Sequence, residues 1–114
     1  MYINIKEKTI NKKKMGKIIY VDIDETICYY QGERNYNLAL PYKDRIEKIN
    51  KLYDEGNHIH YWTERGTKSG EYWLDKTKAQ LDSWGCKYHG ILINKPVYDI
   101  FIDDKNINSN DFFK

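Results

Sequence analysis

Short apolar runs recur along the chain and predict four strands. The first run, IIYV at residues 18–21, is rich in β-branched residues and predicts a strand buried on both faces, as in a parallel sheet. Further apolar runs at residues 58–62, 91–93 and 98–102 predict three more strands. Together these runs supply the strands of one sheet.

Two segments between these runs have the spacing of helices. Apolar residues recur every three or four positions within residues 46–53, after Pro41, and proline is tolerated in the first turn of a helix. Gly56 follows at the position where glycine commonly ends a helix. A second helix is predicted over residues 69–85. The order strand, helix, strand, helix, strand, strand predicts an α/β fold with a mainly parallel sheet.

The connection between the last two predicted strands is short for a parallel sheet. Only five residues lie between Ile93 and Asp99, whereas a parallel crossover commonly takes about a dozen or more. Two alternatives follow. The third strand lies earlier, around residues 87–89, or residues 88–102 contain a hairpin-like pairing.

Length and composition indicate a single globular domain. The 114 residues divide into residues 1–14, an N-terminal extension or edge strand, and residues 15–114, one domain. Hydrophobic residues make up 40% and charged residues 32%, which argues against a disordered or membrane protein. No apolar run approaches the ~20 residues that cross a bilayer, and the polar N-terminus lacks the apolar segment of a signal peptide. We therefore expect a cytoplasmic protein with no membrane partner.

Charge and cysteine content exclude little else. The net charge of +2 is too small to favour a nucleic-acid partner, although such a partner stays open. Lys12, Lys13 and Lys14 form a basic run, which a solvated tail explains more simply than a binding patch. Cys28 and Cys86 lie far apart and form no CxxC pair, so we expect free thiols.

Carboxylates gather where the predicted strands end. Asp22 and Asp24 follow the first strand, Thr63 follows the second, and the pair Asp103-Asp104 follows the last. Open α/β sheets bind ligands at the carboxyl ends of their strands, so these side chains are expected at one edge. Neighbouring carboxylates repel, and Mg²⁺, which prefers oxygen ligands, would offset that repulsion. Each aspartate alone could equally form a turn or cap a helix, but the whole cluster predicts a magnesium site.

These residues resemble the motifs of the haloacid dehalogenase (HAD) superfamily. Residues 18–26, IIYVDIDET, resemble its first motif, a hydrophobic strand followed by DxDxT. Residues 61–63, Lys95 and residues 102–104 resemble the second, third and fourth motifs, in the same order along the chain. The resemblance spans residues 18–104 and implies a Rossmann-like three-layer sandwich, the HAD core.

Residues 63–105 are similar to small HAD proteins of bacterial capsule and sugar-phosphate biosynthesis. Those proteins carry TxRG, QLxxWGxKY, GKP and IDDK segments, whereas here Asn94 replaces the glycine before Lys-Pro and Glu64 stands where alanine is common. Residues 27–43, called the flap below, leave no room for a cap domain. The resemblance therefore implies a capless enzyme, and similar capless enzymes form homo-oligomers.

The resemblance also implies catalytic roles. Asp22 would attack phosphorus and form an aspartyl-phosphate, and Asp24 would act first as general acid and then as general base. Thr63 and Lys95 would bind the phosphoryl group. Arg65 would reach the phosphate or, alternatively, form a structural ion pair. Because the connection that follows Lys95 is short, Lys105 and Lys68 are alternatives to it.

The implied metal ligands belong to the same motifs. Asp22, the backbone carbonyl of Asp24, and Asp103 would hold Mg²⁺, with Asp104 near the ion or sharing it.

We thus expect Mg²⁺-dependent hydrolysis of a small phosphate monoester, favoured by the resemblance to be a sugar phosphate of polysaccharide biosynthesis. A polynucleotide 3′-phosphatase and a phosphoprotein phosphatase are alternative enzymes. A non-catalytic phosphate-binding module is the alternative from another class.

Overall fold

A parallel three-stranded sheet forms the centre of the protein. The structure, a computed structural model, describes residues 16–114, so the predicted extension at residues 1–14 lies outside the described residues. The strands β1 (Ile18–Val21), β4 (His58–Trp62) and β5 (Gly90–Leu92) pair in the order β1-β4-β5. Both pairings are parallel, and β4 lies in the middle.

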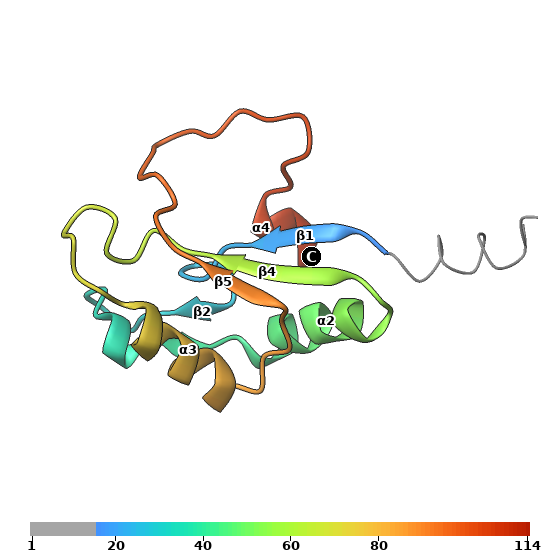
Figure 1. The fold of residues 1–114 in the computed structure, drawn as a ribbon, viewed down its shortest axis with the longest axis horizontal. Coiled ribbons are helices and arrows are strands. Elements are labelled where there is room, and N and C mark those ends of the chain that lie inside the picture. Colours follow the sequence, from blue (N-terminus) through green and yellow to red (C-terminus); the bar gives the residue numbers. More distant parts are fainter. Residues whose placement is uncertain (1–15) are drawn as a thin grey trace, which may run out of the picture.

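Two helices connect these strands and confirm the predicted α/β fold. Helix α2 (Lys43–Asp54) joins β1 to β4, and helix α3 (Leu74–Ser83) joins β4 to β5. Successive strands step in one direction across the sheet, and right-handed crossovers then place both helices on the same face. Figure 1 shows both α2 and α3 below the sheet.

The flap contains its own small elements. The strands β2 (Cys28–Tyr29) and β3 (Leu40–Pro41) pair antiparallel, and the 3-10 helix η1 (Tyr36–Leu38) lies between them. The short helix α4 (Ser109–Phe112) comes near the end of the chain, where the Phe112 carbonyl accepts a hydrogen bond from Lys48 of α2. No helix among residues 16–114 is long and apolar enough to span a membrane.

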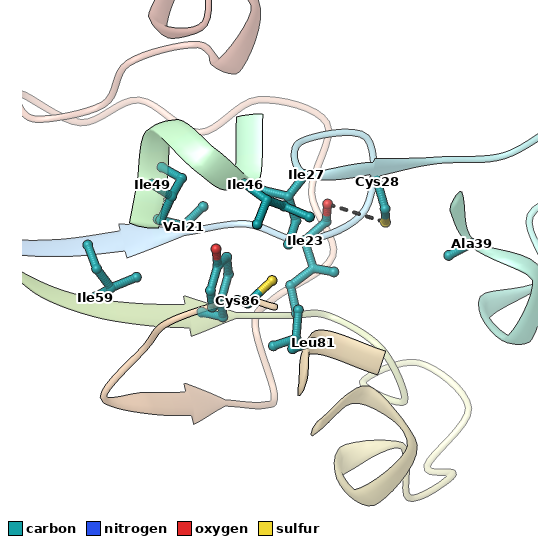
Figure 2. Packing of buried hydrophobic residues seen from close by; sticks show 11 residues of the cluster. Val21, Ile23, Ile27, Cys28, Ala39, Ile46, Ile49, Ile59, Leu81 and Cys86 are labelled. Atoms are coloured by element: carbon teal, nitrogen blue, oxygen red, sulfur yellow. Dashed lines mark hydrogen bonds between the residues drawn. The ribbon is translucent and has the colours of Figure 1, made fainter. Parts of the chain in front are cut away.

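The core lies between the sheet and the two helices. Ile59 and Tyr61 of β4 are fully buried there. Figure 2 shows Ile59 among other side chains of this cluster. Side chains of α2 and α3, Ile46, Ile49 and Leu81, complete it. Both thiols, Cys28 and Cys86, are free and buried, as expected, and burial raises the pKa of Cys28 to about 12 and that of Cys86 to about 11.

The prediction that the first strand is buried on both faces is wrong. Ile18 and Tyr20 are 72% and 55% exposed, because β1 lies at the edge of the sheet and the helices pack on the other face. Within residues 16–114, no second helical layer buries these two side chains. Of the three layers that the resemblance implies, the described part of the chain shows the sheet and one helical layer.

Glycines with positive φ set the helix ends. Gly56 has a φ of 98° and its N–H donates to Tyr53 O at 3.0 Å, so it ends α2 as predicted. The second helix begins at Leu74 and not at residue 69, because Gly66 and Gly70, with φ of 84° and 78°, lie in the left-handed region. Residues 64–73 consequently form a loop. Gly85, with a φ of 75°, follows the last turn of α3.

The predicted strand at residues 98–102 is also wrong. These residues carry no strand pairing, and Ile102 is 94% exposed. Strand β5 ends at Leu92, and too few residues follow for the chain to cross back into the sheet before residue 98. Residues 93–108 instead make a wide loop above the sheet (Figure 1). The alternative strand at residues 87–89 and the hairpin-like pairing are not formed either.

Candidate active site

Three of the predicted site residues meet at the carboxyl edge of the sheet. Asp22 directly follows β1, and Thr63 directly follows β4. The Thr63 carbonyl accepts a hydrogen bond from the Lys95 N–H at 3.1 Å, so the chain beyond β5 continues alongside β4. The Lys95 Nζ then lies 3.4 Å from Asp22 Oδ1 and forms an ion pair. Among residues 16–114, Lys95 is the lysine that forms an ion pair with the predicted nucleophile, and the alternatives Lys105 and Lys68 are both exposed.

Asn94 explains how the chain turns into Lys95. It has a φ of 63°, in the left-handed region, which asparagine adopts more readily than most residues other than glycine. Asparagine at this position is therefore compatible with the turn that leads into Lys95.

Asp22 is partly exposed, and its surroundings nevertheless disfavour the ionised form of its carboxyl group. Burial raises its pKa, and the positive charge of Lys95 and a hydrogen bond from the Ile23 N–H lower it by less, so the pKa ends above the ordinary value. The side chain is still 38% exposed. Asp22 is thus a weakly solvated carboxylate, with one cation beside it, that a ligand can reach.

A tight turn separates Asp22 from Asp24. The Ile23 carbonyl accepts from the N–H groups of Thr26 and Ile27 at 3.1 and 2.9 Å, and Glu25 has a φ of 60°. Ile23 is fully buried within this turn. The turn therefore leaves Asp22 at the edge of the sheet while Asp24 points into the protein.

Asp24 forms a buried ion pair with Arg65. Arg65 Nε donates to Oδ2 at 3.0 Å and Nη2 donates to Oδ1 at 2.8 Å, with the two side chains 1% and 5% exposed. The Tyr30 hydroxyl and the Cys28 thiol also donate to Oδ1. Burial by itself would raise the pKa of Asp24, but the hydrogen bonds and charge of Arg65 outweigh it, so the pKa is lowered. Asp24 is therefore an ionised carboxylate at neutral pH.

The third side-chain nitrogen of Arg65, Nη1, binds to α3, and α3 binds in turn to the flap. Nη1 donates to Thr77 Oγ1 at 3.2 Å and to Gln80 Oε1 at 2.8 Å. The Gln80 side chain in turn donates to the Tyr36 carbonyl at 2.6 Å, and the guanidinium lies 4.8 Å from the Tyr36 ring. All three nitrogens of Arg65 thus point to protein acceptors. This geometry matches the structural ion pair and not the predicted contact with phosphate.

Thr63 is placed beside the site but below its surface. The residue is 1% exposed, and its Oγ1 accepts a hydrogen bond from the Arg65 N–H at 3.1 Å. Its predicted role in binding phosphate stays a prediction.

The structure does not bring the predicted metal ligands together. Asp103 and Asp104 are exposed on the 93–108 loop, because the strand that would have delivered them to Asp22 is not formed. Both side-chain oxygens of Asp24 accept hydrogen bonds from Arg65, which does not bear on its backbone carbonyl, the predicted ligand. Within residues 16–114, no group of three or more His, Cys, Asp or Glu side chains lies close enough to hold a metal ion. The predicted carboxylates therefore form no such group there, and magnesium binding stays a prediction.

No feature of the sequence indicated the partners that bury Asp24 and Arg65. Tyr30 lies in the flap, whereas Thr77 and Gln80 lie on α3, and no motif or spacing relates the flap residue to these two. The signal that could have found them is Arg65 itself, since an arginine directly after a buried strand needs a partner.

Comparison with known proteins supports the fold and names no function. No protein-family model matches the chain, and no curated protein sequence matches it. The fold is similar to that of a structural-genomics target from Vibrio cholerae, known from a crystal structure, with a TM-score of 0.76 and 25% sequence identity. The similarity covers 87% of this chain and 88% of that chain.

Proposed function

We propose that this protein is a phosphatase with a Rossmann-like core of the HAD type, which hydrolyses phosphate monoesters through Asp22. The observation that carries the proposal is the pair formed by Asp22 and Lys95, 3.4 Å apart at the carboxyl edge of a parallel sheet. That edge is where open α/β folds bind ligands. A carboxylate with one adjacent cation, partly open to solvent, is suited to a phosphorylated substrate.

The chemistry proceeds in two steps. Asp22 Oδ attacks phosphorus, the bond from phosphorus to the ester oxygen breaks, and an aspartyl-phosphate forms. Water then attacks that phosphorus and gives up a proton, for which Asp24 is the proposed acceptor. The bond between phosphorus and Asp22 breaks, which releases inorganic phosphate and restores the carboxylate. Lys95 reduces the repulsion between the carboxylate and the anionic phosphate in both steps, because its ammonium lies beside Asp22. Because Asp22 is weakly solvated, its carboxylate gives up little hydration when it attacks phosphorus.

The proposed acid–base role of Asp24 requires that its hydrogen bonds at the site change. A general acid needs a proton, whereas Arg65 holds Asp24 ionised and lowers its pKa. Asp24 would therefore have to part from Arg65 and Tyr30 to protonate a departing alkoxide. An Asp24 that stays paired has a structural role only.

The substitution Asp24→Asn distinguishes these roles. If Asp24 is the acid, kcat for a hexose phosphate should fall about 100-fold or more, since a general acid contributes about 10²–10⁴-fold to the leaving of an alkoxide. Hydrolysis of acetyl phosphate should fall much less, because acetate leaves without a proton. The measurement is the ratio of the two kcat values. Equal losses on both substrates would exclude Asp24 as the acid and leave it a structural role or the role of base in the second step, which both substrates share.

Magnesium is the predicted cofactor of this reaction, although the predicted carboxylates form no group of ligands among residues 16–114. We expect EDTA to remove phosphate release and added Mg²⁺ to restore it, because a cation would offset the repulsion between phosphate and Asp22. The assay uses hexose phosphates, a 3′-phosphorylated oligonucleotide, a phosphoserine peptide and acetyl phosphate. Full turnover in EDTA would overturn the magnesium requirement alone. No release from any substrate would overturn the phosphatase and leave a binding module.

A sugar phosphate of polysaccharide biosynthesis is the proposed substrate, and the same panel tests it against the nucleic-acid and phosphoprotein alternatives. A cytoplasmic location and a homo-oligomer stay predictions.

A further inference from the structure

A cavity of about 590 Å³ opens between the flap and the 64–73 loop. It lies next to the candidate active site, since its lining residue Glu64 follows Thr63 and its lining residue Val97 comes two positions after Lys95. Figure 1 shows both walls beyond the carboxyl ends of β1 and β4. We call it the flap cavity. The flap cavity therefore offers space beside a phosphate ester bound at Asp22.

Hydrogen bonds hold one wall of the flap cavity to the segment that carries Lys95. Thr67 Oγ1 donates to the Lys95 carbonyl at 2.9 Å, and the Gly70 N–H donates to the Gly66 carbonyl at 2.8 Å. A Cβ atom at Gly66 would lie 2.1 Å from the Glu71 carbonyl oxygen, so this loop closes only with glycine there. The cavity wall and Lys95 therefore keep a set position relative to each other.

Two aromatic side chains form part of the lining. The rings of Tyr36 in the flap and Trp73 before α3 meet edge to face, with centroids 5.0 Å apart. Gln80 and Arg65 contact Tyr36 from below, through its carbonyl and its ring, and this fixes the pair. Trp73 is only partly buried. An indole held in this way can pack flat against the C–H face of a ring-shaped ligand.

The charged groups of the lining are mostly acceptors. Three glutamates, Glu33, Glu64 and Glu71, face one arginine and one lysine. The arginine, Arg34, is already placed 3.6 Å from Glu25 and 3.9 Å from Glu64. Carboxylates accept hydrogen bonds from hydroxyl groups and repel a second phosphate. This lining therefore suits an uncharged, hydroxyl-rich group and opposes a polyanion.

We propose that the flap cavity binds the leaving group of the phosphate ester, and that this group is an uncharged, polyhydroxylated ring. The ring packs on Trp73, and its hydroxyls donate to the glutamates of the lining. The inference rests on the proposed function and adds the residues that select the substrate. It also predicts discrimination against nucleotide strands, whose additional phosphates would meet the glutamates.

The test compares Trp73→Ala with the matched control Tyr72→Ala, which removes an exposed aromatic outside the cavity. KM for hexose phosphates should rise about tenfold or more in Trp73→Ala, as expected when ground-state binding is lost, and stay within about twofold in Tyr72→Ala. Acetyl phosphate, too small to reach the cavity, should be hydrolysed equally by all three proteins. Trp73→Phe, which retains a ring, should recover most of the hexose phosphate affinity.

Two results would overturn the inference about the flap cavity and leave the proposed phosphatase activity standing. One is an equal loss on acetyl phosphate in Trp73→Ala, which would make Trp73 structural. The other is faster hydrolysis of the oligonucleotide or the phosphopeptide than of every hexose phosphate. If no substrate is hydrolysed, a titration of the tryptophan fluorescence with hexose phosphates tests whether the flap cavity binds them. A saturable change in the wild type and Tyr72→Ala, lost in Trp73→Ala, supports the cavity, and no change in any of them overturns it.

Discussion

Asp22→Asn is expected to lose about a thousandfold or more in phosphate release and to unfold at a higher urea concentration than the wild type. The amide cannot attack phosphorus, and loss of a nucleophile removes most of the rate enhancement of an enzyme that uses one. The gain in stability has a separate cause, which is the raised pKa of Asp22 in the folded protein.

The sign of that stability change follows from the direction of the shift. Because the pKa of Asp22 is higher in the folded than in the unfolded protein, folding disfavours its ionised form. The penalty is absent below the unfolded pKa of about 3.9, grows as pH rises from the unfolded to the folded value, and is complete above the folded value. Asparagine resembles the neutral form, so the variant escapes the penalty at pH 7. Since Asp22 is 38% exposed, the gain should be less than about 1 kcal/mol.

Urea unfolding at neutral and acidic pH, alongside the phosphatase assay, measures both effects. Asp103→Asn is the matched control for stability, because it makes the same change at an exposed aspartate outside any ion pair among residues 16–114. Its free energy of unfolding should match that of the wild type. A variant Asp22→Asn that is inactive and less stable than the wild type would indicate damage to the fold and not the loss of a nucleophile.

Arg65→Met is expected to lower the free energy of unfolding by about 3–5 kcal/mol, the usual cost of breaking a buried ion pair by removing one partner. The change leaves the Asp24 carboxylate buried without its cation, and it removes a donor from Thr77 and Gln80. Small domains have only about 5–15 kcal/mol of stability. A large fraction of that stability thus depends on a single side chain.

The control for this prediction is Arg34→Met, which removes an arginine from two exposed pairs. Arg34 lies 3.6 Å from Glu25 and 3.9 Å from Glu64, and exposed pairs contribute about 1 kcal/mol or less. Urea unfolding at pH 7 gives both values. Arg65→Lys keeps the charge but loses the two-pronged contact with Asp24, so its stability should lie between those of Arg65→Met and the wild type. Equal losses in Arg34→Met and Arg65→Met would contradict the structural importance of the buried pair.

The pH dependence gives a second test of the same pair. The pKa of Asp24 is lowered in the folded protein, so its contribution to stability is present above the unfolded pKa of about 3.9 and is lost as pH falls through the folded value. The difference in stability between wild type and Arg65→Met should therefore shrink in strong acid.

Local features of the sequence determined the order and ends of most elements. The spacing of apolar residues predicted β4 and α2, and Gly56 and Gly85 were recognised as helix ends because left-handed backbone favours glycine whatever the surrounding fold. The order of elements also brought Asp22 and Lys95 to one edge of the sheet, since parallel strands present their carboxyl ends together.

The tertiary structure alone decided which apolar faces are buried and which charges pair. Residues 98–102 have the composition of a strand, yet strand formation needs a partner that their short connection cannot reach. Asp24 and Arg65 are 41 positions apart, and the residues next to each in the sequence do not indicate that the two side chains pair. Their pairing depends on β1 and β4 lying side by side, because desolvation compels buried charges to find partners only after the chain has folded.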